Sequence, residues 1–258
     1  MSIKNILLFS FLLICFPAFS QNQKPAPASY PGVAVIELFT SQGDINSPAA
    51  DKLLSEIIVD AEKNNQQVFC LSMHVDFWNR YGWKDPFSSF KFTNRLTNYT
   101  SVLGQKETYT PFMLLNGRTV LPVESKEKIL DLIKTNLATS VPMQPEFTFQ
   151  IFDDTLDISY EVQSAIITAK SGSDKYINVA ILEKSLSTKV EKGDNAGKTL
   201  RNDNVVRLFY SADLKTQKGL LRVPLKKLSP GLNKSIIIFI QEKSNRKVVG
   251  AASMLFLK

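Results

Sequence analysis

The sequence predicts two domains, an α/β domain followed by an all-β domain that we expect to be an antiparallel β-sandwich. The first prediction comes from residues 33–140, where buried-strand patterns alternate with segments whose apolar residues recur at helical spacing. The second comes from residues 146–258, where no long helical face occurs and short runs alternate apolar with polar residues or are rich in β-branched side chains. Residues 141–145 are the expected linker.

The first domain begins with a buried strand, Val33–Phe39, and a helix. Ser47 is the expected N-cap and Pro48 the first helical residue, where proline is favoured. The remaining expected elements are a strand at Val68–Val75, a helical segment that opens at Asp85-Pro86 and ends near Gly104, short strands at Phe112–Leu115 and Thr119–Leu121 joined by an Asn116-Gly117 hairpin turn, and a helix after Ser125. The order βαβαββα is typical of a thioredoxin-like α/β domain with a mixed sheet.

The second domain is expected to contain about seven strands, as in a sandwich of immunoglobulin size. Its clearest strand patterns are Phe147–Phe152, Leu156–Val162, Tyr176–Leu182, Gly219–Val223, Ser235–Ile240 and Val248–Leu257. The segment Lys189–Arg207 is instead polar. We interpret it as a loop that caps itself or contacts the first domain, because its acidic residues do not have the spacing of an EF-hand.

Residues 1–20 have the pattern of a secretory signal peptide. Lys4 provides a basic start, Ile6–Phe16 an apolar stretch, and Ala18-Phe19-Ser20 a cleavage site with small residues at both ends. The apolar stretch is shorter than the about 20 residues that cross a membrane as a helix, so we expect no transmembrane segment. Cleavage after about Ser20 places the expected protein in the periplasm or outside the cell. Residues 21–32, rich in proline and alanine, are the expected flexible tether.

Charge and cysteine content limit the possible functions. The formal net charge of +7 falls to +6 when Lys4 leaves with the signal, and the basic residues are scattered along the chain, so we expect no nucleic-acid partner. The signal also carries Cys15, which leaves Cys70 as the single cysteine and makes an intramolecular disulfide impossible. Cys70 lies in an apolar strand and is expected to be a buried small hydrophobic residue.

The turn between the first strand and the first helix is the most informative segment. Thioredoxin-like proteins place a redox Cys-x-x-Cys pair in such a turn, but here the two positions are Asp44 and Ser47. Dithiol chemistry requires two thiols within bonding distance, so we expect a degenerate, redox-inactive turn. A carboxylate and a hydroxyl at a helix N-terminus also have a purely structural explanation, because both stabilise the positive end of the helix.

Several motifs, in order along the chain, resemble one family. They are Glu37–Gly43, Pro48–Asp51, His74–Trp78, Gly82–Pro86, Tyr109–Pro111, Asn116–Gly117, Val190–Leu200 and Asn204–Arg207. Together they resemble the secreted, thioredoxin-like DUF1223 family, a family of uncharacterised role whose members typically carry cysteines at the positions of Asp44 and Ser47. The resemblance implies that Thr110-Pro111 is a cis bond beside the turn, where an extended peptide could add as a strand.

The candidate peptide or ligand groove consists of residues near this turn: Thr110, Pro111, His74, Asp76, Trp78 and Trp83. The single histidine, His74, is expected to bond Asp76 or backbone, although with Asp44 and Asp51 it could also form a metal site or act as a general base. A Ser47–His74–Asp76 triad is disfavoured, because the turn lacks the strained elbow of hydrolases. The two tryptophans are either packed or form a ligand platform.

These observations predict an exported, redox-inactive protein that acts as a binding or assembly module. The expected partner is a protein or peptide of the cell envelope, and we expect no cofactor, metal or catalytic residue. The alternatives are a structural component of an envelope complex and an enzyme, either thiol-dependent through Cys70 or hydrolytic around His74.

Overall fold

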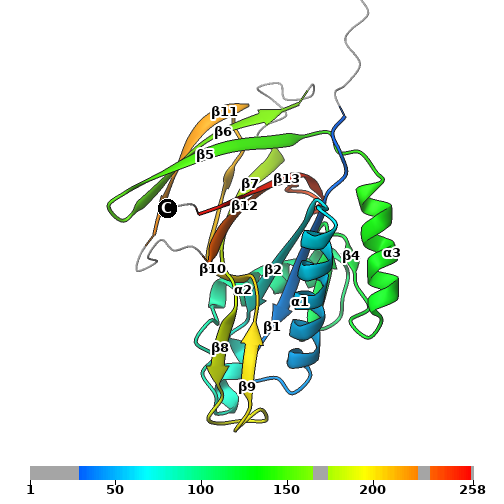
Figure 1. Cartoon of the computed structure of the whole chain (residues 1–258), viewed down its shortest axis with the longest axis vertical. Helices are drawn as coiled ribbons and strands as arrows, with labels where there is room; N and C mark the ends of the chain where they lie inside the picture. Colours follow the sequence, from blue (N-terminus) through cyan, green and yellow to red (C-terminus); the bar gives the residue numbers. More distant parts are fainter. Residues whose placement is uncertain (1–28, 165–173, 226–232, 257–258) are drawn as a thin grey trace, which may run out of the picture.

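A computed structural model of the chain describes residues 29–164, 174–225 and 233–256 (Figure 1). The expected signal peptide, and the tether up to residue 28, lie outside these residues. Within the described ranges, no helix is both long and apolar enough to cross a membrane.

The first part of the chain forms the expected elements in the expected order. They are β1 (Ala34–Thr40), α1 (Ser47–Lys63), β2 (Val68–His74), the 3-10 helix η1 (Phe77–Tyr81), α2 (Phe90–Val102), β3 (Phe112–Leu115), β4 (Thr119–Val120) and α3 (Lys126–Leu137). The predicted N-cap of α1 is wrong by one residue, because Asn46 occupies the N-cap position, without a side-chain hydrogen bond to the helix, and Ser47 is the first helical residue. The hydroxyl of Ser47 instead donates to Asp44 and accepts from the backbone N–H of Ser41.

The second helix begins later than predicted. Asp85 does not open it, because the carboxylate of Asp85 accepts a hydrogen bond from the backbone of Phe87 in a separate turn. The helix α2 starts at Phe90 after Ser89, whose side chain caps it, and it ends just before Gly104, whose φ of 67° is left-handed. The prediction that this helix ends near Gly104 is therefore confirmed.

The second part of the chain consists of strands. They are β5 (Gln144–Phe152), β6 (Thr155–Gln163), β7 (Lys175–Glu183), β8 (Leu186–Lys189), β9 (Thr199–Asn202), β10 (Val205–Asp213), β11 (Lys218–Pro224), β12 (Lys234–Glu242) and β13 (Val248–Leu255). The prediction of a loop throughout Lys189–Arg207 is wrong, because β9 and the start of β10 lie within it. Only the segment between β8 and β9 is a loop, and these two short strands pair as a hairpin.

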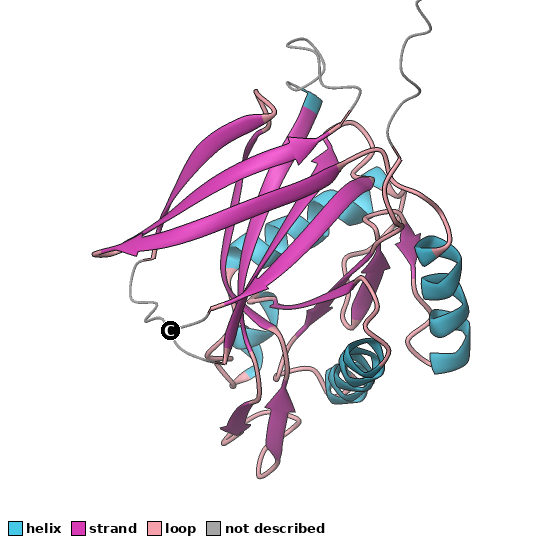
Figure 2. Ribbon diagram, turned by 45° about the horizontal axis from the view of Figure 1, so that its top comes forward, coloured by secondary structure: helices cyan, strands magenta, loops and turns pink. Residues whose placement is uncertain are grey.

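One sheet runs through both parts of the chain. Its eight strands have the order β13-β12-β7-β10-β2-β1-β3-β4, with β1 and β2 parallel and β3 antiparallel to β1. The join is between β2 and β10, where Ser72 pairs with Val205 and its backbone N–H donates to the carbonyl of Asn204 at 2.9 Å. A second sheet, β11-β6-β5, lies across the strands of the second part (Figure 2). The structure is mostly β with a few helices, and the mixed sheet predicted for the first part of the chain is confirmed.

Three apolar cores hold these layers together. On one face of β1 and β2, the side chains of Ile36 and Leu38 pack against α1 and α3. On the other face, Phe39 packs with α2 and with residues of β7, β10, β12 and β13. A third core lies between the β11-β6-β5 sheet and the strands β7, β12 and β13 of the large sheet, and it includes Ile158 and Val179. The helices thus enclose β1 and β2 from both sides, so that the carboxyl ends of these strands form the buried floor of the site described below.

The Asn116-Gly117 hairpin turn also joins the two parts. Both residues have positive φ angles, 48° and 68°, as expected for this turn type. A Cβ atom at Gly117 would lie 2.0 Å from the carbonyl oxygen of Arg246, so only glycine allows the β12–β13 turn to approach. The side chain of Asn116 accepts a hydrogen bond from the backbone of Val35 at 2.8 Å, which fixes the turn on β1.

Candidate functional site

Asp44 and Ser47 lie in the turn between β1 and α1, and both are fully buried. The Oδ2 atom of Asp44 accepts hydrogen bonds from the hydroxyls of Ser47 and Thr110, each at 2.7 Å. Its Oδ1 atom accepts from the backbone N–H of Asn46 at 3.0 Å. The carboxylate is therefore satisfied by neutral donors at the N-terminal end of α1, where a negative charge is favoured. We call Asp44, Ser47 and Thr110 the polar lock.

Thr110-Pro111 is a cis peptide bond, as the family resemblance implies. Thr110 is buried, and its hydroxyl accepts a hydrogen bond from the indole nitrogen of Trp78 at 2.7 Å while donating to Asp44. A continuous chain of hydrogen bonds thus runs from Trp78 to the carboxylate. Of the predicted groove, the structure brings Thr110, Pro111 and Trp78 together beside the turn.

The loop between β8 and β9 covers the turn. The amide nitrogen of Asn195, which is fully buried, donates to the backbone carbonyls of Gln42 and Asp44, each at 3.0 Å. The amide oxygen of Asn195 accepts a hydrogen bond from the amine of Lys198 at 2.9 Å. The expectation that this segment contacts the first part of the chain is confirmed. Because Asp44 and Ser47 are fully buried beneath this loop, a disulfide substrate has no direct path to them.

Both tryptophans are half-buried and hydrogen bonded. Trp78 packs against Phe77 and Tyr81, with a ring separation of 5.3 Å from Tyr81. The indole nitrogen of Trp83 donates to the side chain of Gln42 at 3.2 Å, which ties the η1 segment to the turn. These contacts support the packing interpretation over a ligand platform.

His74 ends β2, is fully buried, and its Nδ1 atom lies 2.7 Å from the carboxylate of Asp85. The prediction of Asp76 as its partner is wrong, because Asp76 accepts a hydrogen bond from Thr93 at 2.6 Å instead. The disfavoured Ser47–His74–Asp76 triad is absent, since none of these three side chains is hydrogen bonded to another. Sequence reasoning missed Asp85 because it belongs to a turn that folds back over the strand ends.

A cluster of buried polar side chains lies at the carboxyl ends of β1 and β2. We call it the polar chamber, and it consists of Thr40, Gln42, Asp51, His74, Asp85 and Asn202, each at most 4% exposed. The Oδ2 atom of Asp51 accepts from Thr40 at 3.1 Å, and Asn202 accepts from Gln42 at 3.1 Å. Ligands of α/β sheets characteristically bind at the carboxyl ends of parallel strands.

Three atoms of the chamber have no hydrogen-bond partner among the described residues. They are Oδ1 of Asp51, Nε2 of His74 and Nδ2 of Asn202. Buried polar atoms without a partner cost about 1–3 kcal/mol each and are rare in folded proteins, so their concentration here makes the chamber a candidate site. Within the described part of the chain, no three His, Cys, Asp or Glu side chains are arranged to share a metal ion.

The chamber contains coupled charges. Burial raises the pKa of Asp51 to about 6, an effect that the positive charge of His74 opposes. Burial lowers the pKa of His74, but the Asp85 carboxylate raises it by more, so the net shift is upward. Burial raises the pKa of Asp85, and the His74 charge together with hydrogen bonds from the backbone outweighs it, so the net shift is downward. The charges of Asp51, His74 and Asp85 therefore influence one another, and His74 is coupled to both carboxylates.

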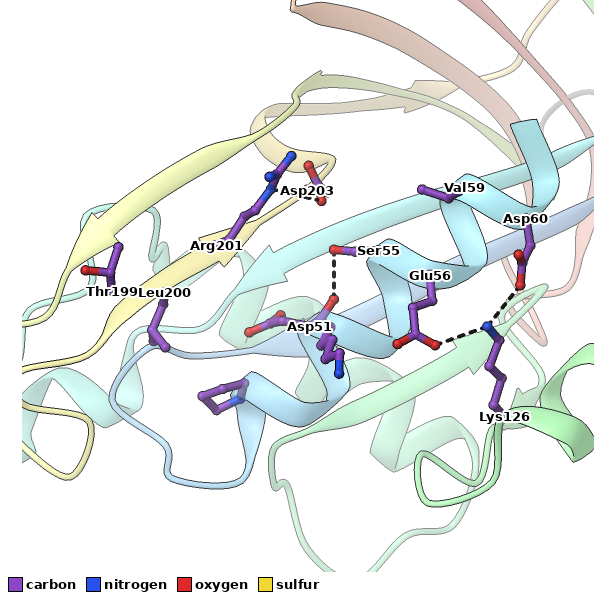
Figure 3. A pocket seen from close by; sticks show the side chains of 12 residues that line it. Asp51, Ser55, Glu56, Val59, Asp60, Lys126, Thr199, Leu200, Arg201 and Asp203 are labelled. Atoms are coloured by element: carbon purple, nitrogen blue, oxygen red, sulfur yellow. Dashed lines mark hydrogen bonds and ion pairs between the residues drawn. The ribbon is translucent and has the colours of Figure 1, made fainter. Parts of the chain in front are cut away.

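A pocket of about 490 Å³ opens beside the chamber, between α1 and β9 (Figure 3). Asp51 lines its inner side, and Figure 3 shows the Asp51 side chain pointing from α1 toward β9. At the outer side, the amine of Lys126 is bonded to Glu56 at 3.1 Å and to Asp60 at 3.0 Å. We call it the α1–β9 pocket. Sequence reasoning did not predict it, because β9 was interpreted as loop.

Cys70 lies in β2 with 2% of its surface exposed. Burial, with a smaller contribution from the charge of Glu62, raises the pKa of the Cys70 thiol to about 12. The thiolate is the reactive form of cysteine, so this side chain is not available for redox chemistry in the folded protein. The expectation of a buried small hydrophobic residue is confirmed.

A second buried polar network was missed by sequence reasoning. Glu37, in the middle of β1 and 1% exposed, accepts two hydrogen bonds from Arg95 at 2.6 and 3.1 Å and one from the hydroxyl of Tyr99. Gln241 of β12 donates to the same hydroxyl at 2.7 Å, so the network joins both parts of the chain. The one available signal was a glutamate within an otherwise apolar strand.

Comparison with known proteins gives the family and the fold. A protein from Agrobacterium tumefaciens, determined by X-ray crystallography, is 23% identical, with a TM-score of 0.65 over 90% of this chain and 97% of that chain. A domain of the outer membrane lipoprotein Omp28 from Porphyromonas gingivalis is 13% identical over 44% of this chain and 87% of that chain, with a TM-score of 0.26, a likeness too slight to bear on the fold. None of the curated proteins matches. The model of the DUF1223 family, described as proteins of unknown function, matches residues 35–241, and the chain therefore belongs to this family.

Proposed function

We propose that this chain is an exported, thioredoxin-like protein that binds a ligand and has no thiol-disulfide activity. The polar lock is the observation that carries the proposal. At the two positions where a dithiol would lie, a carboxylate and a hydroxyl are buried and bonded to each other at 2.7 Å. Neither group can exchange with a disulfide, and Cys70 is enclosed in β2.

The thioredoxin-like part of the proposal is supported by the arrangement around the turn. Parallel β1 and β2, antiparallel β3 and a cis bond before Pro111 surround the N-terminus of α1. Export rests on the signal pattern of residues 1–20.

The α1–β9 pocket supports binding of a small molecule. Its volume of about 490 Å³ lies within the about 300–1,000 Å³ of known ligand sites, and its inner side meets the polar chamber. The predicted groove is a weaker site, because the hydroxyl of Thr110 is committed to two hydrogen bonds and His74 is fully buried. A peptide partner would have to use the half-buried surfaces of Pro111 and Trp78.

Acid–base catalysis is the second candidate function, and one observation favours it. Asp51 combines a pKa of about 6 with a position between the α1–β9 pocket and His74. Shifted pKa values of this kind concentrate at active sites, although structural networks produce them too. This candidate gives the alternative of a hydrolytic site around His74 a different set of partners, Asp51 and Asp85.

The redox half of the proposal is tested by reduction of a model disulfide with dithiothreitol. Purified residues 21–258 should give no rate above the uncatalysed background. A Cys70→Ala variant serves as the matched control and should behave identically. Turnover by the natural protein would contradict the proposal, and its loss in Cys70→Ala would assign the activity to that thiol.

The binding half is tested by native mass spectrometry of protein purified from its own host. We expect a small molecule that is retained by the natural protein and lost in Ser55→Trp, because Ser55 lines the α1–β9 pocket and tryptophan would fill it. Thr135→Trp, on the exposed side of α3, is the control and should retain the molecule. Equal retention in both variants would exclude the pocket as the binding site.

A further inference from the structure

A second cavity, of about 240 Å³, lies between α2, β10 and the β12–β13 turn. We call it the α2–β10 pocket. Three cationic side chains line it, Lys91, Arg95 and Arg246, together with amide and aromatic groups, and no carboxylate does. Its lining is thus unlike that of the α1–β9 pocket, where acidic side chains are as prominent as basic ones.

Arg95 is held rigidly at the inner side of this pocket. Its Nε and Nη2 atoms donate to Glu37, and Nη2 also bonds Tyr99 and Gln241. The guanidinium lies 4.5 Å from the ring centre of Phe209. Because these contacts already fix the side chain, a ligand would lose little conformational entropy in binding it.

One nitrogen of the Arg95 guanidinium has no partner among the described residues. The Nη1 atom makes no hydrogen bond to any of them, and it is not among the atoms that are enclosed without a partner. Arg95 lines the pocket and its side chain is 14% exposed, so we infer that the N–H groups of Nη1 are available to a ligand there. A guanidinium with one edge on Glu37 and its other donors available is a pre-organised site for an oxyanion.

The lining supplies further donors from α2 and from the β12–β13 turn. Lys91, Asn94 and Asn98 follow one face of α2 with Arg95, and their side chains are exposed and without hydrogen bonds to described residues. Arg246 comes from the opposite side, and its Nε atom is buried with no acceptor among the described residues. Since Glu37 balances Arg95, the charges of Lys91 and Arg246 stay unopposed by any lining carboxylate.

We propose that the α2–β10 pocket binds the oxyanion group of a small, soluble phosphate or sulfate ester. The pocket presents several donors from α2 and from the β12–β13 turn, and a tetrahedral oxyanion can accept from more directions than a planar carboxylate. Its volume of about 240 Å³ accommodates such a group together with a small substituent. The face of Phe209 provides an apolar wall for the ester substituent. The site is separate from the polar lock and the α1–β9 pocket, so it stands independently of the proposed function.

The test is calorimetric titration with phenyl phosphate at constant ionic strength. The full-length mature protein should bind it, and Lys91→Met/Arg246→Gln should weaken binding by about tenfold or more, since each lost charge-assisted hydrogen bond typically costs that much. Lys128→Met/Arg222→Gln removes the same charge elsewhere on the surface and should bind as the natural protein does. Circular dichroism melts establish that both variants fold, and Lys91→Met alone replaces the double variant if it does not.

Several results would overturn the proposal. Equal affinity in all three proteins would show a general charge effect, and no binding up to millimolar concentration would show that the site is not built for an oxyanion. A further arm uses vesicles of phosphatidylcholine with and without phosphatidic acid. Binding to the acidic vesicles without binding to phenyl phosphate would assign the site to a lipid headgroup and would refute a soluble ester.

Discussion

Replacing Asp51 with asparagine should change how the stability of the protein depends on pH. Asp51 has its pKa raised from 3.8 to about 6 in the folded protein, and each pKa unit corresponds to about 1.36 kcal/mol. The raised pKa of Asp51 therefore corresponds to about 3 kcal/mol in the free energy of unfolding. Because the folded-state pKa is the higher one, this stabilisation is fully present below about pH 4 and is lost as the pH rises through about 6.

The variant removes this contribution while preserving an oxygen that can accept the hydrogen bond from Thr40. The unfolding free energy of Asp51→Asn minus that of the natural protein should therefore increase by about 3 kcal/mol between pH 4 and pH 7.5. Urea unfolding at half-unit pH intervals measures this difference directly. Asp131→Asn, whose carboxylate is exposed and makes no hydrogen bond or ion pair with described residues, is the control and should give a flat difference.

His74 offers a second readout, because it is the single histidine of the chain. The negative charge of Asp51 helps to raise the pKa of His74, so Asp51→Asn should lower that pKa in an NMR titration. A stability difference that stays constant with pH, together with an unmoved His74 titration, would refute the coupled chamber. Asp51 would then have to be solvated more fully than its burial indicates.

Three further predictions concern the rest of the buried polar groups. Arg95→Ala should lower the unfolding free energy by about 3–5 kcal/mol, because it leaves Glu37 charged and unpaired. Adding Glu37→Gln should restore part of the lost stability in the same urea assay, because it removes the unpaired charge. Cys70 should resist a thiol reagent until the protein is denatured, and rapid labelling of the native protein would contradict its burial. Asn195→Ala should cost about 1–3 kcal/mol and speed proteolysis of the β8–β9 loop, because two backbone carbonyls lose their donor. Unchanged stability and cleavage would show that the loop is held by other contacts.

The predictable part of the fold is the part with strong local signals. The Pro48 start of α1, the Gly104 end of α2 and the Asn116-Gly117 turn lie within a residue or two of their predicted places, because each depends on backbone preferences of nearby residues. β9 was missed for the opposite reason. Asn202, at its end, is a poor strand residue by propensity, and it is placed by a contact with Gln42 that only the fold creates. β10 was missed although residues 205–210 are rich in β-branched and aromatic side chains, because its start was interpreted as part of the polar loop that precedes it.

In the candidate site too, residues with local sequence signals could be located and residues placed by the fold could not. Asp44 and Ser47 could be located from the strand–turn–helix pattern, and the consequence of losing both thiols followed from their chemistry. The partner of His74 could not be located, because Asp85 is eleven residues away in a turn without periodicity. Sequence proximity favoured Asp76 as the partner. Asp76 lies beyond the end of β2, however, and its side chain accepts a hydrogen bond from Thr93 on α2 instead.

The buried polar residues of the first part share one feature that connects fold to function. Asn195 donates to the backbone carbonyl of Asp44, Asn202 accepts from Gln42 in the polar chamber, and Gln241 joins the network of Glu37. In each case an amide from the second part of the chain serves a polar group that the first part could not satisfy alone. An amide carries both a donor and an acceptor but no charge, so it can close a polar site without adding a buried ion. The second part is therefore a component of the site itself, and a covered turn of this kind is compatible with retained binding but not with exchange of a protein disulfide.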